Sequence, residues 1–476
     1  KFRILTCKVI CVNIILVIKM THIKRFVLLL IVLFIVASSA ACGGGENTAT
    51  TDKPENEISE ALKDYVLDSE AVLDSMPEEL KNTKLTWYNW EDITGLPEEK
   101  LIAQFEEKTG IDVEVRIVNY SKYVDLVAGM LTVGETPDVL RMRSSSIGMM
   151  KLLQPISCTG YDFSGKEWDQ SISKTYSYGE KCYGVNLFYT HYMMADLLVY
   201  NPSTMETMGF EDPWTLWKNG KWTWDKMKEM TTTWVEQGTD YIGACLWPYN
   251  APCVTRGGSF TIRHPDGTYE LDLLNENNLK GWRFTLDGIA ANLFTNINDG
   301  VDLIKQQTLF GSMSASIVRG AQTTNDSIFP KMRRRGNFAV VPHPKWEDAE
   351  YCLPIGEWTA FGIPKAAKNP KAVPYFLAWI CNLDNCDLSI YDKETNPYGY
   401  FYSQQTKDCY MDVLAIENRS TTNNGCLDYS GEFGSPFDFL IRKYISSTQL
   451  NTWLQTKKPI LDNSINMFNE DALKLN

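Results

Sequence analysis

Three strand-like segments decide the fold: Leu85-Thr-Trp-Tyr-Asn-Trp90, Ile111-Asp-Val-Glu-Val-Arg-Ile-Val118 and Thr136-Pro-Asp-Val-Leu140. Between them, apolar residues recur at helical spacing over 97–109 and 123–133, and a glycine follows each of these two stretches. Glycine after a periodic segment is a common end of a helix. The resulting β-α-β-α-β order predicts a mostly parallel sheet with helical crossovers.

The composition excludes several classes of protein. The chain has 476 residues, 44% hydrophobic and 22% charged, which fits a folded protein of two or three domains and excludes disorder of the whole chain. With 59 acidic residues against 46 basic ones, a basic nucleic-acid binder is excluded as well. The 14 tryptophans and 23 tyrosines exceed the needs of a core of this size. We therefore expect the surplus rings to form stacking surfaces for a ligand.

The N-terminal segment has the features of an export signal. Basic residues after Met20 are followed by the apolar run 26–36 and by small residues before Cys42. This run is too short for a comfortable transmembrane helix but suits a secretory signal peptide, and the small residues before a cysteine resemble a bacterial lipoprotein cleavage site. We predict a leader and lipoprotein signal peptide over 1–41, in which 1–19 is an over-extended translation start. An ordinary signal peptide with an incidental cysteine is the alternative.

After cleavage Cys42 would carry the lipid anchor. Residues 42–83 are predicted to be a flexible tether, because 43–57 is polar and without periodicity, although 62–80 could form loose amphipathic helices. Nine cysteines follow Cys42, an odd number that cannot pair completely, and none forms C-x-x-C. No metal site and no cofactor are predicted, and the sequence leaves open whether these cysteines are thiols or disulfides.

Several segments in a fixed order resemble one family. The helical stretch contains F-E-x-x-T-G, the third strand begins T-P-D-V, and three later segments follow in order: Cys182-Tyr-Gly-Val-Asn-Leu-Phe188, Trp222-Thr-Trp-Asp225 and Phe361-Gly-Ile-Pro-Lys365. This set resembles the extracellular solute-binding proteins of family 1, the maltose-binding type, which supply ABC sugar importers. One departure is that Arg319, and no tryptophan, follows the segment 311–318, where relatives supply a ring.

The resemblance implies an α/β, two-lobe fold like that of the type II periplasmic binding proteins. Each lobe would be a mostly parallel sheet flanked by helices, and crossing hinge strands would join the two lobes. On this reading lobe 1 comprises 84–191 and 312–345, and lobe 2 comprises 192–311 and 346–476. A ligand would be trapped between the lobes by hinge closure.

Candidate ligand-binding residues combine aromatic faces with polar groups. A sugar presents hydroxyl groups around its edge and apolar C–H patches on its faces, so its site needs rings together with carboxylates, amides and arginine. Such groups follow strand ends, where ligands bind in parallel α/β sheets. Alternation along the first strand implies that Trp87 or Tyr88 packs in the core. The candidates are Asn89, Trp90, Glu91, Ser145, Trp247, Tyr249, Arg319, Glu357 and Trp358.

The sequence thus predicts a monomeric, lipid-anchored solute-binding protein on the outer face of the cell membrane. It would capture a sugar or oligosaccharide and deliver it to ABC permease subunits, with no catalysis and no nucleic-acid partner. Enzyme motifs such as G-x-S-x-G and H-E-x-x-H are absent. The alternatives are a secreted glycan-degrading enzyme and a sensor subunit of the same fold that presents its ligand to a membrane kinase.

Overall fold

The computed structural model describes ten stretches of the chain. They are residues 67–94, 97–188, 195–246, 250–295, 307–314, 339–355, 359–381, 403–416, 418–420 and 446–474. Within these residues no helix is both long enough and apolar enough to span a membrane. The predicted signal peptide and Cys42 lie outside the described residues.

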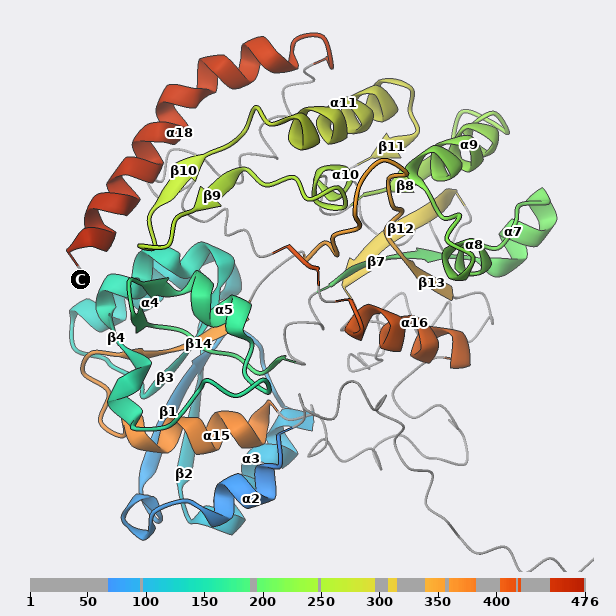
Figure 1. The fold of residues 1–476 in the computed structure, drawn as a ribbon. Coiled ribbons are helices and arrows are strands. Elements are labelled where there is room, and N and C mark those ends of the chain that lie inside the picture. Colours follow the sequence, from blue (N-terminus) through green and yellow to red (C-terminus); the bar gives the residue numbers. More distant parts are fainter. Residues whose placement is uncertain are drawn as a thin grey trace, which may run out of the picture. The chain divides into compact units, whose positions relative to one another are not determined.

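The first sheet has five strands in the order β2-β1-β3-β14-β4 (Figure 1). They are β2 (Asp112–Ile117), β1 (Lys84–Asn89), β3 (Val139–Arg143), β14 (Thr359–Pro364) and β4 (Leu153–Gln154). Strand β1 is parallel to both β2 and β3, whereas β14 is antiparallel to β3 and β4. Helices α3 (Pro97–Thr109) and α4 (Tyr123–Thr132) form the two crossovers. The predicted β-α-β-α-β unit is therefore confirmed.

Gly110 ends α3 for a steric reason. Its amide donates to the Glu106 carbonyl at 2.8 Å while its φ is +71°, a left-handed conformation that favours glycine. A side-chain carbon at this position would lie 2.2 Å from Oδ1 of Asn82. The backbone conformation thus favours glycine at this helix end, and a larger residue would also have to displace the Asn82 side chain.

The second sheet has the strand order β11-β8-β12-β7-β13. Its strands are β11 (Phe294–Thr295), β8 (Ile242–Cys245), β12 (Thr308–Ser314), β7 (Asp196–Tyr200) and β13 (Ala339–Pro342). Strand β8 is parallel to β11 and β12, whereas β7 is antiparallel to β12 and β13. The helices that lie between these strands along the chain include α7 (Pro202–Met208), α8 (Pro213–Lys218), α9 (Trp224–Val235) and α11 (Glu276–Ala290). Thr223 caps α9 by accepting from the Lys226 amide.

The predicted lobe boundaries are wrong after residue 311. We assigned 312–345 to the first lobe, but β12 and β13 both pair with β7 in the second sheet. We assigned all of 346–476 to the second lobe, but β14 pairs with β3 in the first sheet, from Thr359 opposite Arg143 onward. Both β13 and β14 are fully buried strands. A continuous apolar run fits the middle of either sheet, so its sequence does not specify which sheet it joins.

The predicted tether is folded from Leu67 onward. Helix α2 (Ser69–Asp74) begins at Asp68, whose side chain accepts from the Ala71 amide. The Ser69 hydroxyl donates to the Ala378 carbonyl at 2.6 Å, which ties α2 to α15 (Val373–Ile380). Leu73, Met76 and Leu80 are buried in the same hydrophobic cluster as α15. The prediction of a tether over 42–83 is therefore wrong for 67–83, and 42–66 lies outside the described residues.

Tryptophan in this protein is mainly a core residue. Of the twelve tryptophans that the structure describes, eight are buried: Trp87, Trp168, Trp222, Trp224, Trp234, Trp282, Trp346 and Trp379. Strand alternation places Trp87 and Tyr88 in different hydrophobic clusters, one on each side of the first sheet, so both rings are core. The expectation that the surplus rings serve as ligand surface is wrong for these eight.

The remaining elements are short, except for two helices near the C-terminus. Helix α16 (Gln404–Leu414) contacts β13, and α18 (Leu450–Leu473) contacts β10. The hairpin of β9 (Thr261–Arg263) and β10 (Tyr269–Leu271) turns at Gly267 with φ +89°. The other elements are α5 (Gln170–Thr175), β5 (Ser177–Tyr178), β6 (Lys181–Cys182), α10 (Ala251–Val254) and the 3-10 helices 78–80, 120–122, 144–152, 156–159 and 370–372.

The two sheets are linked by chain segments that pair with each other. Ala195, just before β7, forms an antiparallel bridge with Ile355, and the Asp196 amide donates to the Pro354 carbonyl at 3.0 Å. Residues 354–355 lie between β13 of the second sheet and β14 of the first. The described residues of these two connections therefore pair with each other, as expected for neighbouring crossing segments.

Candidate functional site

One end of the first sheet brings the predicted site residues of β1 close to β3. Because β1 and β3 are parallel, their carboxyl ends at Asn89 and Arg143 lie at the same edge. Ligands of open α/β sheets bind at this edge. Strand β14 runs the opposite way and begins there, with Thr359 opposite Arg143. Loops after β1 and β3, together with the chain entering β14, thus meet at one edge.

A hydrogen-bonded network fixes the loop that follows β1. Arg141 of β3 donates through Nη1 to Oδ1 of Asn89 at 3.2 Å and to Oε2 of Glu91 at 3.0 Å. Asn89 is 1% exposed, accepts from the Trp90 amide and donates to the Glu91 carbonyl. Both ends of its amide are therefore used within the protein. Asn89 and Arg141 hold the loop, whereas the Glu91 side chain keeps 37% of its surface exposed.

Trp90 lies between aromatic and cationic neighbours. Its ring meets Tyr123 edge-on at 5.0 Å between centroids and Tyr120 at 6.0 Å. The Arg141 guanidinium lies 4.5 Å from its ring centroid, within the range of a cation–π contact. The ring is half-buried, so the packing fixes its plane while part of its surface remains exposed. This combination is suited to stacking against a flat apolar face of a ligand.

Tyr120 extends the same surface. It is 44% exposed, and the Arg143 guanidinium lies 3.9 Å from its ring centroid. Arg143 also donates to the Tyr120 carbonyl at 3.2 Å and to its hydroxyl at 2.8 Å. The Tyr123 hydroxyl donates to the Tyr88 carbonyl at 3.0 Å, and burial raises the pKa of this hydroxyl. The edge thus carries two partly exposed rings, each supported by an arginine.

The β1 loop could be predicted from the sequence, but the residues of β3 and around the start of α4 that support it could not. Arg141 and Arg143 are two residues apart on a strand whose other members, Val139, Leu140 and Met142, are fully buried. Two arginines at the carboxyl end of a buried strand were the available signal, because charged groups there are kept only with partners. Tyr120 and Tyr123 carried no comparable signal, since their approach to Trp90 depends on tertiary packing.

The corresponding edge of the second sheet is described only in part. Strand β8 ends at Cys245, shortly before the predicted Trp247 and Tyr249, and β12 ends at Ser314, before the predicted Arg319. Opposite Ser314 lies Asp196, which is 3% exposed. Its Oδ2 has no hydrogen-bond partner among the described residues, and burial raises the pKa of this carboxyl well above its usual value.

Six of the nine predicted binding residues have side chains that the structure does not describe. The backbone of Ser145 belongs to the 3-10 helix Ser144–Leu152. The others are Trp247, Tyr249, Arg319, Glu357 and Trp358. Glu357 and Trp358 directly precede Thr359, the residue of β14 that lies opposite Arg143. Asn89, Trp90 and Glu91 are described, and the structure brings them together with Arg141.

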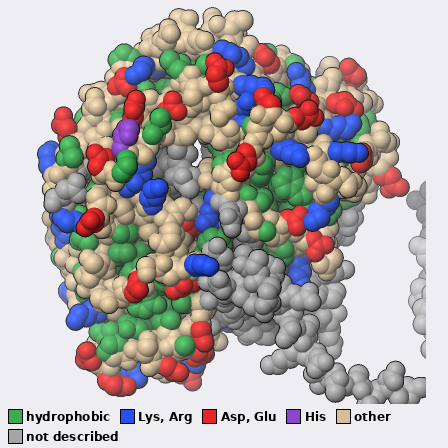
Figure 2. Space-filling model, viewed as in Figure 1, with side chains coloured by type: hydrophobic (Ala, Val, Ile, Leu, Met, Phe, Trp, Pro, Cys, Tyr) green, Lys and Arg blue, Asp and Glu red, His purple; other side chains and the backbone are tan. Residues whose placement is uncertain are grey.

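Neither a metal centre nor a disulfide is found in the described part of the chain. No group of three or more His, Cys, Asp or Glu side chains there could hold a metal ion. Five cysteines of these residues are free thiols: Cys158, Cys182, Cys253, Cys352 and Cys409. On the face shown in Figure 2, acidic and basic side chains are mixed without a large area of one sign. Charge alone therefore does not mark a binding surface on that face.

The sequence also matches the profile of a known protein family. The profile of the family described as "Bacterial extracellular solute-binding protein" matches residues 91–382. The chain belongs to this family. The match starts in the loop after β1 and ends just after α15, so it includes the second sheet and every strand of the first sheet except β1. The family binds solutes and is not enzymatic, which confirms the resemblance and the non-catalytic role inferred from the sequence.

Solved structures show the same fold with different ligands. An ABC substrate-binding protein of Listeria monocytogenes in complex with cycloalternan is 13% identical, with a TM-score of 0.55. The GacH receptor of Streptomyces glaucescens, studied with acarbose, is 12% identical, with a TM-score of 0.57. UgpB of Mycobacterium tuberculosis, in complex with glycerophosphocholine, is 14% identical, with a TM-score of 0.54. Each comparison covers 82% of this chain and 98% of the other.

These likenesses confirm the predicted two-lobe α/β fold. At such low identity they extend to the fold alone, and the ligands in the three solved structures differ in chemistry. A search of curated proteins gives no match. The ligand must therefore be argued from the residues of this chain.

Proposed function

We propose that this protein is the carbohydrate-binding component of an ABC importer. The observation that carries the proposal is the half-buried Trp90, held by Arg141 and Tyr123 and adjoining the exposed Tyr120 at the carboxyl edge of the first sheet. Flat rings of fixed orientation match the apolar face of a sugar, while Glu91 and the arginines can bond to its hydroxyl groups. Several solved proteins of this fold have sugar ligands, including the cycloalternan and acarbose binders.

The proposed site also uses residues beyond the described loop. Ser145 follows β3, and Glu357 with Trp358 directly precedes β14, so both positions belong in sequence to the same edge of the first sheet. Trp247 and Tyr249 after β8, and Arg319 after β12, would supply the groups from the second sheet. Capture would consist of closure of the two lobes over the ligand about the paired crossing segments. No bond of the ligand is made or broken.

Thermal unfolding with a panel of neutral oligosaccharides tests the proposal. A ligand that binds only the folded state stabilises it in proportion to ln(1 + [L]/Kd), which is about 2.7 kcal/mol at a hundredfold excess over Kd. At least one glycan of the panel is expected to raise the unfolding midpoint in a saturable way. Glycerophosphocholine belongs in the same panel as the non-sugar competitor. If glycerophosphocholine alone raises the unfolding midpoint, or if no compound of the panel raises it, the ligand is not a carbohydrate.

We also propose that Cys42 carries a lipid that anchors the protein to the outer face of the cell membrane. The support is the apolar run, the small residues before Cys42 and the family's extracellular location. Two acyl chains anchor a protein stably where one does not. Growth with labelled palmitate should label the wild-type chain, and Cys42→Ser should remove the label and release the protein from the membrane fraction. Retention of the label by Cys42→Ser would refute the anchor.

A further inference from the structure

A cavity of about 460 Å³ lies on the second sheet, away from the proposed ligand site. Tyr241 immediately precedes β8 and Gln307 immediately precedes β12, two parallel neighbours. The cavity is therefore at the amino ends of these strands, whereas the candidate loops at 247–249 and 319 follow their carboxyl ends. Strand β12 has seven residues, which separates the two ends by about 20 Å at ~3.3 Å per residue. The two places are distinct.

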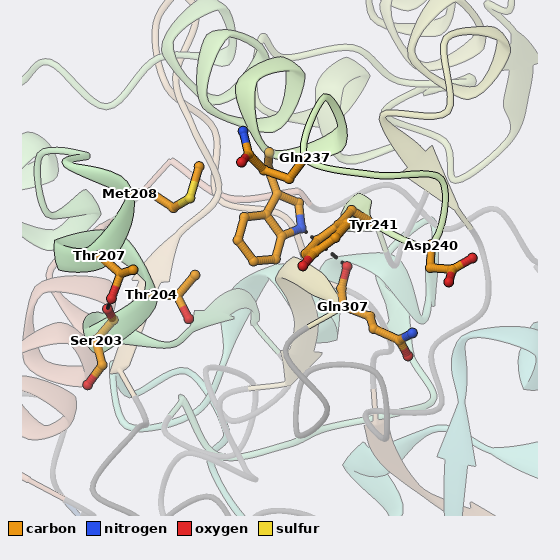
Figure 3. A pocket seen from close by; sticks show the side chains of 9 residues that line it. Ser203, Thr204, Thr207, Met208, Gln237, Asp240, Tyr241 and Gln307 are labelled. Atoms are coloured by element: carbon orange, nitrogen blue, oxygen red, sulfur yellow. Dashed lines mark hydrogen bonds between the residues drawn. The ribbon is translucent and has the colours of Figure 1, made fainter.

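The walls of the cavity come from separate elements. Thr204 and Thr207 of α7 lie on one side, and Tyr241, Asp240 and Gln307 lie on the other (Figure 3). The first wall offers hydroxyl groups, and the second offers an amide, a carboxylate and a phenol ring. The described residues that line the cavity include no lysine or arginine. Such a lining suits a neutral, hydroxyl-rich molecule and disfavours an anion.

The aromatic part of the cavity is fixed before any ligand arrives. The Trp234 ring meets Tyr241 edge-on, with 4.8 Å between centroids and 88° between planes. Trp234 also donates through Nε1 to the Gln307 carbonyl at 3.2 Å, which ties α9 to the entry of β12. Trp234 is 5% exposed, also lines the cavity and packs against the ring of the half-buried Tyr241. A ring held in place costs little entropy when a ligand stacks on it.

We propose that this cavity is a second carbohydrate site, which binds a neutral sugar or short oligosaccharide independently of closure between the lobes. Its volume is within the range of small-molecule sites, ~300–1,000 Å³. The ring of Tyr241 stacks against the ligand. The hydroxyl groups of α7 and the Gln307 amide form hydrogen bonds to the ligand's hydroxyl groups. Because the cavity is open and lies on one sheet, binding is expected to be weak, in the millimolar range.

Saturation-transfer NMR on the full chain tests this site. The probes are maltotetraose, cellotetraose, xylotetraose and mannotetraose, each at 10 mM, and at least one is expected to receive saturation. Trp90→Ala, which impairs the proposed site between the lobes, should leave the weak signal unchanged. Tyr241→Ala should reduce the weak-site affinity at least tenfold. Thr204→Trp, which fills the cavity from a different wall, should do the same without removing the Trp234–Tyr241 contact.

Calorimetric titration of the same variants, with the glycan that most raises the unfolding midpoint, measures the tight site between the lobes separately from the weak cavity site. Tyr241→Ala and Thr204→Trp should retain the tight site, whereas Trp90→Ala should weaken it. Weak binding that persists in both cavity variants, or the absence of any signal with all four probes, would overturn the second site. A tight site that is missing from every variant and from the wild-type chain would refute the proposed function, and the NMR result would still decide the cavity.

Discussion

The tryptophans of the second sheet and Trp90 of the first sheet have opposite surroundings. Trp222, Trp224 and Trp346 are all at most 8% exposed, and each donates its ring N–H within the protein, to Pro342, Thr255 and Pro252 respectively. Trp90 is half-buried at a sheet edge beside Arg141. A buried tryptophan with its N–H satisfied stabilises the fold, whereas a partly exposed ring held by charged neighbours is suited to recognition. Surroundings, and not residue type, separate the two roles.

The largest expected effect is on the core side of this comparison. Trp224→Ala should lower the free energy of unfolding by about 3–5 kcal/mol, because it removes a fully buried ring and leaves the Thr255 hydroxyl without its donor. Urea denaturation measures the change. Trp453→Ala is the matched control, since Trp453 is half-buried on α18 and should cost less. Equal losses in the two variants would show that burial does not distinguish these tryptophans.

His343, beside Trp224, gives the same core a dependence on pH. It is fully buried and stacks on Trp224 at 6.0 Å, neither ring nitrogen has a partner among the described residues, and burial lowers its pKa to about 3. The unfolded chain binds a proton at this position below a pH of about 6.5, but the folded chain does not until about 3. Stability from this group is therefore complete above pH 6.5 and decreases as the pH falls, by about 3 kcal/mol at pH 4.

His343→Phe is the variant that isolates this dependence. The ring is of similar size and cannot be protonated, so the part of the stability loss between pH 6.5 and 4 that comes from His343 should disappear. Chemical denaturation of both chains across this interval measures it. His264→Phe is the matched control for the same substitution at an exposed histidine, because His264 is 42% exposed next to Glu270. Identical pH profiles for wild type and His343→Phe would contradict the buried, neutral histidine.

The smallest effect is expected on the recognition side. Arg141→Lys keeps the charge but loses the planar group that contacts Asn89, Glu91 and the Trp90 ring together. Affinity for the ligand should fall about threefold to tenfold, roughly 1 kcal/mol, with little change in the unfolding midpoint. Arg116→Lys is the control, because Arg116 pairs with Glu114 on an exposed face of β2. Equal ligand affinities of Arg141→Lys and Arg116→Lys would show that Arg141 does not support the binding surface.

Much of the first sheet could be predicted from the sequence, but the later strands could not be assigned to a sheet. Alternation in β2 and the glycines after α3 and α4 are local signals, and the structure has those elements at the expected positions. The strands β13 and β14 are continuous apolar runs, and only their tertiary pairing with β7 and β3 distinguishes them. A local pattern sets the type of an element, whereas its partner depends on packing over the whole chain.

Some residues of the candidate site could likewise be predicted from the sequence, and others could not. Asn89, Trp90 and Glu91 could be found because they directly follow a predicted strand. Arg141 could not, because its role arises from the parallel pairing of β1 with β3, which places residues 50 positions apart within 3.0 Å. Conversely, the abundance of tryptophan suggested ligand surface, yet eight of the described rings are core. Residue counts predict which chemistry is available, but only burial shows where it is used.

The most direct test of the account is calorimetric titration of the wild-type chain and of Trp90→Ala with the glycan that most raises the unfolding midpoint. The account predicts one tight site in the wild-type chain and at least tenfold weaker binding in Trp90→Ala, about 1.4 kcal/mol or more, with a smaller loss of stability in the free protein than Trp224→Ala causes. Equal affinity in the two chains would contradict the central claim, that the edge built by Trp90 and Arg141 is where this protein recognises its solute.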